Sequence, residues 1–205
     1  MRKVIIDKLM NYITKRKKLN EDSKAIIKYG LESIYILITK SIVIFTIACL
    51  LGIFKEMITF LLLFNVIRTY AHGLHATKSY ICLIVSSLCF IILPYISKII
   101  TIPDMLKIIM GIILTILIFK NSPADTHKKP IVSKKIRKKL KIKSTIIAVI
   151  FVVLSLFVNN FISNCLLLSL LLETIFISPL TYKIFKLPYN NYLTYLEREE
   201  KNVLS

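Results

Sequence analysis

Six long apolar segments follow one another along this chain of 205 residues, at about 34–54, 57–67, 80–97, 105–119, 145–162 and 165–181. Hydrophobic residues make up 56% of the sequence and the mean hydropathy is +0.70, which is too apolar for a soluble domain of this length. A helix needs roughly 20 mostly apolar residues to cross a bilayer. The sequence therefore predicts an all-α polytopic membrane protein with about six transmembrane helices, in a single membrane domain over residues 1–205.

The segment 57–67 is the weakest of these spans, because its apolar run is short of roughly 20 residues and could instead be re-entrant. The distribution of charge argues against that alternative. If 57–67 did not cross, the Lys-rich segment 128–143 would lie outside while the basic amino terminus lay inside, contrary to the positive-inside rule. Six crossings place both termini in the cytoplasm, together with a loop over 68–79, a basic loop over 128–143 and a tail over 183–205.

Positive charge dominates the polar part of the chain, with 29 Lys and Arg against 11 Asp and Glu. Much of it lies in 1–29 and 128–143, beside the predicted spans. Because most of the chain is expected in lipid, anionic headgroups or an acidic peptide are favoured as partners, and no nucleic acid is expected. Lys128 and Lys129, which open the second cluster, could dock an acidic peptide, or these charges could serve only as an anchor on anionic lipid.

The amino terminus is predicted to be an amphipathic helix lying in the membrane interface. Over residues 1–19, helical spacing places four large side chains on one face: Ile5, Leu9, Tyr12 and Ile13. Asn20 is predicted to cap the next helix, whose first turn contains Glu21 and Asp22. Residues 1–30 are therefore expected to form a cytoplasmic amphipathic segment. The apolar stretch at 4–6 is too short for the core of a cleavable signal.

The polar island 68–79 carries the chemistry-bearing residues, and Cys82 follows His75 by seven positions. An imidazole beside a thiol can take its proton and leave a thiolate, the nucleophilic form of cysteine. On a continuous helix, however, a spacing of seven separates two residues by about 10.5 Å along the axis. Activation needs contact at roughly 2.6–3.2 Å, so a catalytic pair requires an interruption of the helix between them.

The sequence offers such an interruption. Gly73 supplies permissive backbone dihedral angles just before His75, and Thr77 and Ser79 are suitable first residues of a helix. We therefore expect the chain to fold back ahead of the third span. Cys82 would then lie near the amino-terminal end of that helix, at the cytoplasmic edge of the membrane.

The residues Arg68, Gly73, His75-Ala76 and Cys82, in a basic chain of this length with six predicted spans, resemble the accessory gene regulator protein B (AgrB) family of Gram-positive quorum sensing. The resemblance implies a membrane cysteine endopeptidase that cleaves a small precursor peptide and helps to form a cyclic thiolactone or lactone signal. It also implies a precursor with an acidic carboxyl-terminal tail, a homodimer, and no cofactor or metal.

By match to the family motif, Cys82 is the nucleophile and His75 its base, with Arg68 and Gly73 as supporting residues. The oxyanion stabiliser stays open between the Arg68 guanidinium and backbone N–H groups at the start of the following helix. One departure is His72, at a position where the family often has a second glycine. His72 is therefore also a candidate second base.

Two other classes of function compete with a peptidase. A metal-dependent hydrolase could use His72 and His75 as ligands, although 68–82 contains no carboxylate to complete such a site. A small transporter or non-catalytic membrane partner could use Lys40 and Glu173, which are ionisable residues within apolar segments. These two side chains could pair with each other, or Lys40 could reach the interface while Glu173 serves as a structural hydrogen-bonding group. The remaining cysteines are expected to be packing residues: Cys49, Cys89 and Cys165.

Overall fold

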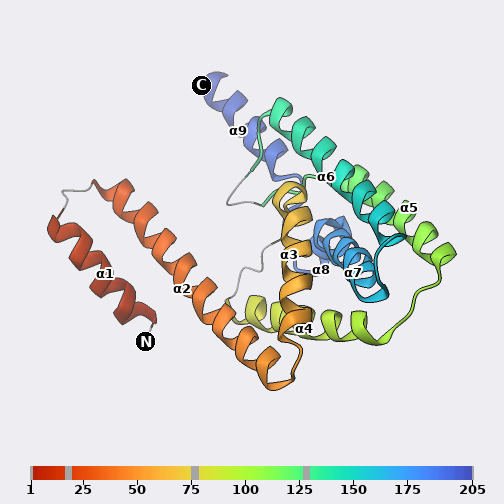
Figure 1. Ribbon diagram of the computed structural model, residues 1–205. Helices are drawn as coiled ribbons and strands as arrows, with labels where there is room; N and C mark the ends of the chain where they lie inside the picture. The colour runs from red at the N-terminus through yellow and green to blue at the C-terminus, as the bar shows by residue number, and fades with distance from the viewer. Residues whose placement is uncertain (1, 17–19, 75–78, 127–129, 205) are drawn as a thin grey trace. The chain divides into compact units, whose positions relative to one another are not determined.

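The computed structural model describes residues 2–16, 20–74, 79–126 and 130–204, and these parts of the chain are almost entirely helical (Figure 1). The chain divides into two compact units, Met1–Leu50 and Leu51–Ser205. The first holds α1 (Arg2–Arg16) and α2 (Glu21–Leu50). The second holds α3 (Phe54–Ala71), α4 (Ser79–Ile99), α5 (Asp104–Asn121), α6 (Lys134–Ser155), α7 (Asn160–Ile177), α8 (Pro179–Ile184) and α9 (Asn191–Leu204). The prediction of an all-α chain is confirmed.

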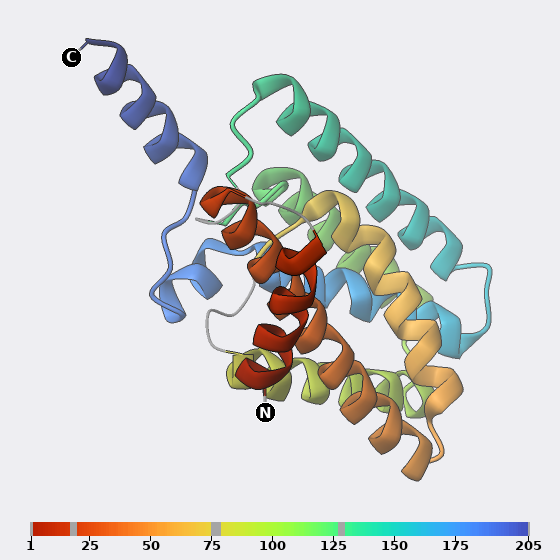
Figure 2. The same ribbon diagram turned by 90° about the vertical axis from the view of Figure 1, so that its left-hand side faces the viewer.

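In the first unit, α1 packs along the first half of α2 (Figure 2). The side chain of Asp7 lies 4.0 Å from the Lys28 ammonium across this contact. Asn20 caps α2 as predicted, because its Oδ1 accepts a hydrogen bond from the Ser23 N–H at 3.0 Å. Leu9 and Tyr12 on α1 are exposed, which suits an interfacial helix, but that location stays a prediction.

In the second unit, α7 lies at the centre and packs against α3, α4, α5 and α6 (Figure 1). Its side chains are mostly buried, and Leu166 and Leu170 share a core with Ile67 of α3 and Leu114 of α5. Glycine brings two of the surrounding helices close together. A Cβ at Gly111 of α5 would lie only 2.5 Å from a methyl carbon of Val152 in α6.

Two helical stretches among the described residues are long and apolar enough to cross a membrane, Ser23–Leu50 and Asn160–Ile177. Leu83–Ile99 is a shorter apolar stretch. The other predicted spans, and the orientation of all of them, stay predictions. Large apolar side chains also point outward along α5 and α6, among them Ile108, Ile112, Ile116, Ile146, Val149 and Val153.

The expected loops at 68–79 and 128–143 are wrong in part. Arg68 lies in the last turn of α3, which ends at Ala71 and is 18 residues long, so the helix extends beyond the uninterrupted apolar run on both sides. In the basic segment, α6 begins at Lys134, and the Ser133 hydroxyl accepts from the Ile136 N–H at 3.5 Å. Lys and Arg are good helix formers, so a capped basic segment continues directly into the apolar one.

Candidate functional site

The site is built where α3 ends and the chain turns sharply. His72 and Gly73 both adopt positive φ, at 59° and 111°. A Cβ at Gly73 would lie 2.6 Å from Arg68 Nη1 and 3.1 Å from the carbonyl oxygen of Phe176. Both the backbone conformation and the lack of space therefore require glycine at position 73.

Backbone hydrogen bonds then join this turn to two distant parts of the chain. The Gly73 N–H donates to the Ala124 carbonyl at 2.9 Å, and the Ala124 N–H donates to the Ala71 carbonyl at 3.0 Å. The Leu74 N–H donates to the Phe176 carbonyl at 3.1 Å. The end of α3, the connection after α5 and the end of α7 thus meet in one backbone frame.

Arg68 links the same turn to α7 through its side chain. One guanidinium nitrogen, Nη1, lies 3.3 Å from Oε2 of Glu173, and the other, Nη2, donates to the Leu74 carbonyl at 2.5 Å. The guanidinium carbon lies 5.3 Å from the centre of the Phe176 ring. The Glu173 side chain is fully buried and that of Arg68 is 14% exposed. The sequence left open a pairing of Glu173 with Lys40, and the structure instead gives Glu173 an ion pair with Arg68.

A small cavity of about 150 Å³ opens beside this turn. Three segments of the chain contribute its walls: the end of α3 with the turn after it, the connection after α5, and the stretch before α6. The lining residues are Arg68, His72, Gly73, Ala124, Asp125, Thr126 and Ile131.

Asp125, which sequence reasoning missed, holds the start of α9 against this region. Its two carboxylate oxygens accept from the backbone N–H groups of Asn191 at 3.0 Å and Tyr192 at 2.9 Å. The same carboxylate lies 3.6 Å from the Arg137 guanidinium of α6, which stacks over the Tyr192 ring. In the sequence, Asp125 is marked only as an acidic residue just ahead of the basic segment 128–143, which did not indicate that it would hold α9.

Tyr182 of α8 also contacts Asp125. Its hydroxyl donates to the Asp125 carbonyl oxygen at 2.8 Å. Burial raises the pKa of Tyr182, so this hydroxyl stays protonated at neutral pH and remains a donor.

The predicted catalytic pair is only partly described. His75 lies outside the described residues, and Cys82 is the fourth residue of α4, in its first turn, with a side chain that also lies outside them. Among the described residues, α3 ends at Ala71, residues 72–74 are not helical, and α4 is described from Ser79 onward. A break in the helix ahead of the third span is thus confirmed at residues 72–74, whereas an interruption between His75 and Cys82 themselves and a meeting of their side chains stay predictions.

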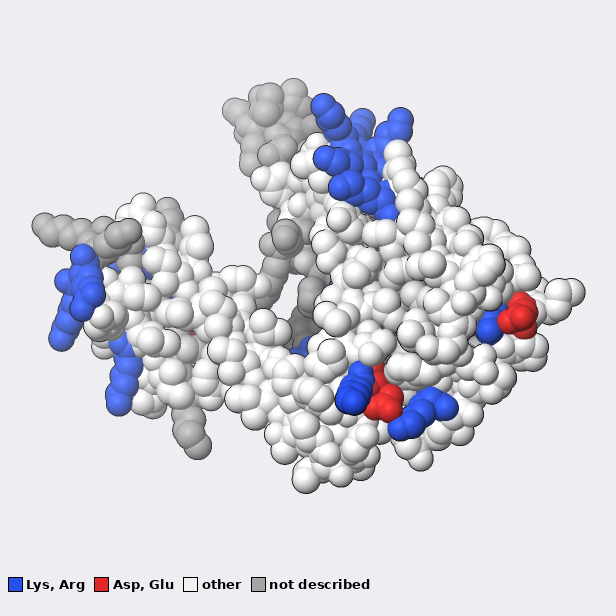
Figure 3. Space-filling view, in the orientation of Figure 1, with Lys and Arg blue, Asp and Glu red and all other residues white. Residues whose placement is uncertain are grey.

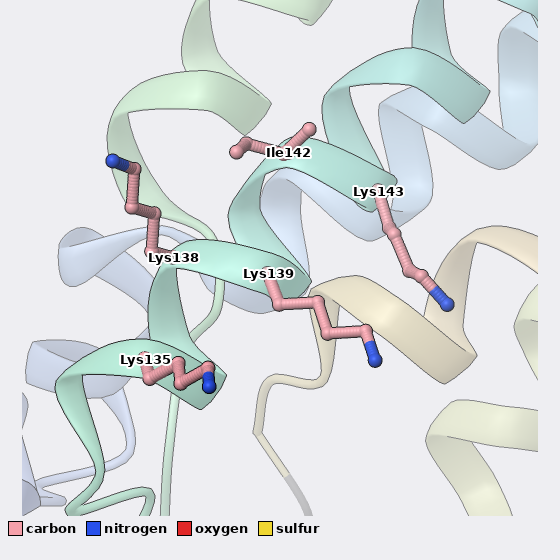
Figure 4. A pocket seen from close by; sticks show the side chains of 5 residues that line it. All are labelled: Lys135, Lys138, Lys139, Ile142 and Lys143. Carbon is pink, nitrogen blue, oxygen red and sulfur yellow. The ribbon is translucent and has the colours of Figure 1, made fainter.

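The basic segment presents a set of lysines on one side of α6, which we call the α6 lysine face. Lys135, Lys138, Lys139 and Lys143 line an open hollow of about 380 Å³ together with Ile142 (Figure 4). Figure 3 shows basic side chains gathered where α6 begins. The ammonium of Lys143 lies 5.1 Å from the ring centre of Tyr70 in the last turn of α3. The predicted docking residues Lys128 and Lys129 lie outside the described residues.

Within the described ranges, no group of three or more His, Cys, Asp or Glu side chains is arranged to hold a metal ion. His72 lines the cavity described above, and its proposed partner ligand, His75, falls outside those ranges.

Comparison with known proteins identifies the family of this chain. Residues 6–177 match the family model described as Accessory gene regulator B. The chain belongs to the AgrB family. The matched range includes Arg68, Gly73, Cys82, Asp125 and Glu173, whereas α9 lies beyond it. AgrB proteins are membrane-associated and take part in peptide processing for quorum sensing, and this chain shares that role.

Individual AgrB relatives support the same assignment. A putative AgrB-like protein of Clostridium acetobutylicum is 31% identical over 167 residues, covering 81% of this chain and 80% of the relative. The accessory gene regulator protein B of Staphylococcus carnosus is 37% identical over 134 residues, covering 64% and 70%. A putative AgrB-like protein of Listeria innocua is 34% identical over 183 residues, covering 88% and 89%. No solved structure matches the chain.

Proposed function

We propose that this protein is a membrane cysteine endopeptidase that cleaves a small precursor peptide and helps to form a cyclic thiolactone or lactone signal. The observation that supports it most is the interruption between α3 and α4. The chain leaves the helical path of α3 at His72 and Gly73, just ahead of His75, and Cys82 lies in the first turn of α4. The partial positive charge at the amino-terminal end of a helix favours a thiolate there.

In the proposed reaction, His75 takes the proton of the Cys82 thiol, and the thiolate attacks a backbone carbonyl carbon of the precursor. The peptide C–N bond breaks, His75 gives its proton to the leaving amine, and a thioester forms on Cys82. A thiol or hydroxyl within the bound amino-terminal fragment then attacks the thioester carbon. The ring closes, the Cys82 thiol is restored, and exclusion of water at the membrane edge protects the intermediate from hydrolysis.

The contacts of Arg68 bear on which group stabilises the oxyanion. Its two terminal nitrogens already contact Glu173 and Leu74. Backbone N–H groups in the first turn of a helix have no partner within that helix. We therefore assign oxyanion stabilisation to the first turn of α4, where Cys82 itself lies.

The α6 lysine face supports the proposal for the substrate. It offers several ammonium groups, of which that of Lys143 lies close to the end of α3, and an acidic precursor tail would complement them. Lys128 and Lys129 precede this face in the sequence and would extend it. A homodimer and cytoplasmic termini complete the proposal, and they rest on the family and on the positive-inside rule.

Co-expression of the chain with its precursor peptide in membranes tests this reaction. We expect Cys82→Ala and His75→Ala to abolish cleavage while each variant still inserts into the membrane. The unaltered protein should accumulate a precursor fragment joined to Cys82 by a bond that hydroxylamine cleaves, as a thioester requires. Full cleavage by Cys82→Ser, together with loss of cleavage on adding a chelator, would instead indicate a metal-dependent hydrolase.

A further inference from the structure

We propose that Glu173 is a positioning residue for His75, and that it acts through Arg68 and Leu74. The inference rests on the proposed peptidase function and extends it to a residue of α7. Glu173 lies 98 positions after His75 in the sequence, yet its partner Arg68 contacts the residue that directly precedes His75.

The first step of the argument is the two-sided contact of Arg68. A guanidinium is planar and can present separate N–H groups to two acceptors at once. Here Nη1 faces both carboxylate oxygens of Glu173, at 3.3 and 3.4 Å, while Nη2 donates to the Leu74 carbonyl. With the carboxylate removed, the guanidinium would keep its contact with the Phe176 ring, whose centre lies 5.3 Å from the guanidinium carbon, but a ring contact does not direct an individual N–H group towards Leu74.

The second step is that the N–H group, the carbonyl group and the side chain of Leu74 all have contacts in the structure. Its N–H donates to the Phe176 carbonyl, its carbonyl accepts from Arg68, and its side chain is buried with 7% exposure. The backbone that enters His75 is thus set relative to the end of α7. Loss of the Arg68 contact would release the carbonyl and allow the peptide group between Leu74 and His75 to rotate.

The third step concerns why a charged pair lies there at all. Buried ion pairs are seldom more stabilising than apolar residues of similar size, because both groups lose their hydration. A pair with one carboxylate fully buried is therefore poorly explained by stability alone. Control of geometry at a neighbouring reactive residue is a better explanation.

The test uses the thiolate fraction of Cys82 as its readout. In membranes containing the full chain with Cys49, Cys89 and Cys165 replaced by alanine, the rate of Cys82 alkylation by iodoacetamide is measured against pH. Only the thiolate reacts, so the midpoint reports whether His75 is in place. We expect His75→Ala to raise the midpoint, and Glu173→Gln to raise it in the same direction with at least a tenfold loss of precursor cleavage.

The direction of the shift separates positioning from a simple charge effect. Removal of a negative charge near a thiol favours the thiolate and would lower the midpoint. A lowered or unchanged midpoint for Glu173→Gln, in a background where His75→Ala raises it, would overturn the inference. An unchanged midpoint for His75→Ala itself would overturn the proposed function, so the two failures can be told apart.

Two further variants guard against a general loss of structure. Arg68→Lys keeps the charge beside Glu173, but an ammonium cannot match the guanidinium fork that also reaches Leu74, so we expect the same upward shift. Ser169→Ala, one turn earlier on α7, removes a buried hydroxyl that donates to the Leu166 carbonyl within the same helix, and it should leave both readouts unchanged. A shift in Ser169→Ala as large as in Glu173→Gln would mean that any change in α7 has this effect, and would overturn the inference.

Discussion

At the scale of single residues, Gly73 combines a positive φ of 111° with little space for a Cβ. We predict that Gly73→Ala lowers precursor cleavage at least tenfold, because the added Cβ meets Arg68 Nη1 and the backbone of α7 at a strained positive φ. The expected cost in folding free energy is about 2 kcal/mol. Cleavage in membranes and thermal unfolding in detergent measure the two effects.

Gly30 provides the matched control for this change. Gly30 is inside α2, and apart from the backbone of that helix no atom of the described residues lies within 4 Å of the position that its Cβ would occupy. Gly30→Ala should therefore leave cleavage intact and stabilise the helix by about 0.5–1 kcal/mol. Equal losses in both glycine variants would contradict the role given to Gly73.

His72 gives a second prediction at this scale. Its φ of 59° is unfavourable for a residue with a side chain. We predict that His72→Gly retains cleavage and does not lower the unfolding temperature, because relief of backbone strain offsets the greater freedom of glycine in the unfolded chain. Loss of cleavage in this variant, with the unfolding temperature unchanged, would instead identify His72 as a second base.

The sequence anticipated part of this residue-level arrangement. Sequence reasoning assigned Gly73 the role of permitting a turn and left Arg68 as a candidate oxyanion stabiliser, whereas their contacts with α7 appear only in the structure. Glu173 stood out as an ionisable group in an apolar segment, but its partner lies 105 positions away. No periodicity within one segment reports such a distance, so the pairing could not be inferred.

At the scale of helices, Asp125 decides how α9 is held. We predict that Asp125→Ala releases α9, because two backbone N–H groups lose their acceptor and the Arg137 guanidinium loses its counter-ion. Removal of one partner from a buried charged pair costs about 3–5 kcal/mol. Limited proteolysis of the detergent-solubilised protein should then cut within 191–204 much faster than in the unaltered chain.

An exposed ion pair serves as the comparison for Asp125. Glu21 pairs with Lys24 on the surface of α2, with 89% of the glutamate side chain exposed. Glu21→Ala should change stability by less than about 1 kcal/mol and leave the proteolysis of α9 unchanged. Resistance of α9 to protease in Asp125→Ala would show that other contacts hold this helix.

The apolar segments of the sequence predicted the order of the helices, but they did not predict the residues at which the helices begin and end. Each of the six apolar segments falls mainly within α2 to α7, and Asn20 correctly marked the start of α2. Lys134 to Lys143 were assigned to a loop because charge was used to find boundaries, although lysine favours helices. Charge identifies which part of a helix leaves the membrane, and it does not identify where the helix ends.

For the whole molecule, the prediction concerns which connecting segments face the cytoplasm and which face the outside of the cell. We predict that single cysteines at Lys55 and Thr101 react with a membrane-impermeant maleimide in intact cells, in a background without the native cysteines. Cysteines at Lys134 and Lys183 should react only after permeabilisation, because the positive-inside rule places them in the cytoplasm. Labelling of Lys134→Cys in intact cells would show that an odd number of segments crosses ahead of it.

The fold class followed from composition, while the packing around α7 did not. Apolar content alone demands helices in a bilayer, since each helix satisfies its own backbone hydrogen bonds. Whether α7 or another helix lies at the centre depends on which helix faces pack against one another. In lipid, where apolar residues are suitable on every face, the sequence carries little information about that choice.

The frame that joins the turn after α3 to Ala124 and Phe176 consists of peptide groups, which every residue except proline can supply in full. Substitutions at those two positions can therefore accumulate over evolutionary time without deleting a bond of the frame. Homologues that share only about a third of their residues with this chain can inherit the same geometry. Natural drift should be restricted mainly at Gly73, where the essential property is the absence of a side chain.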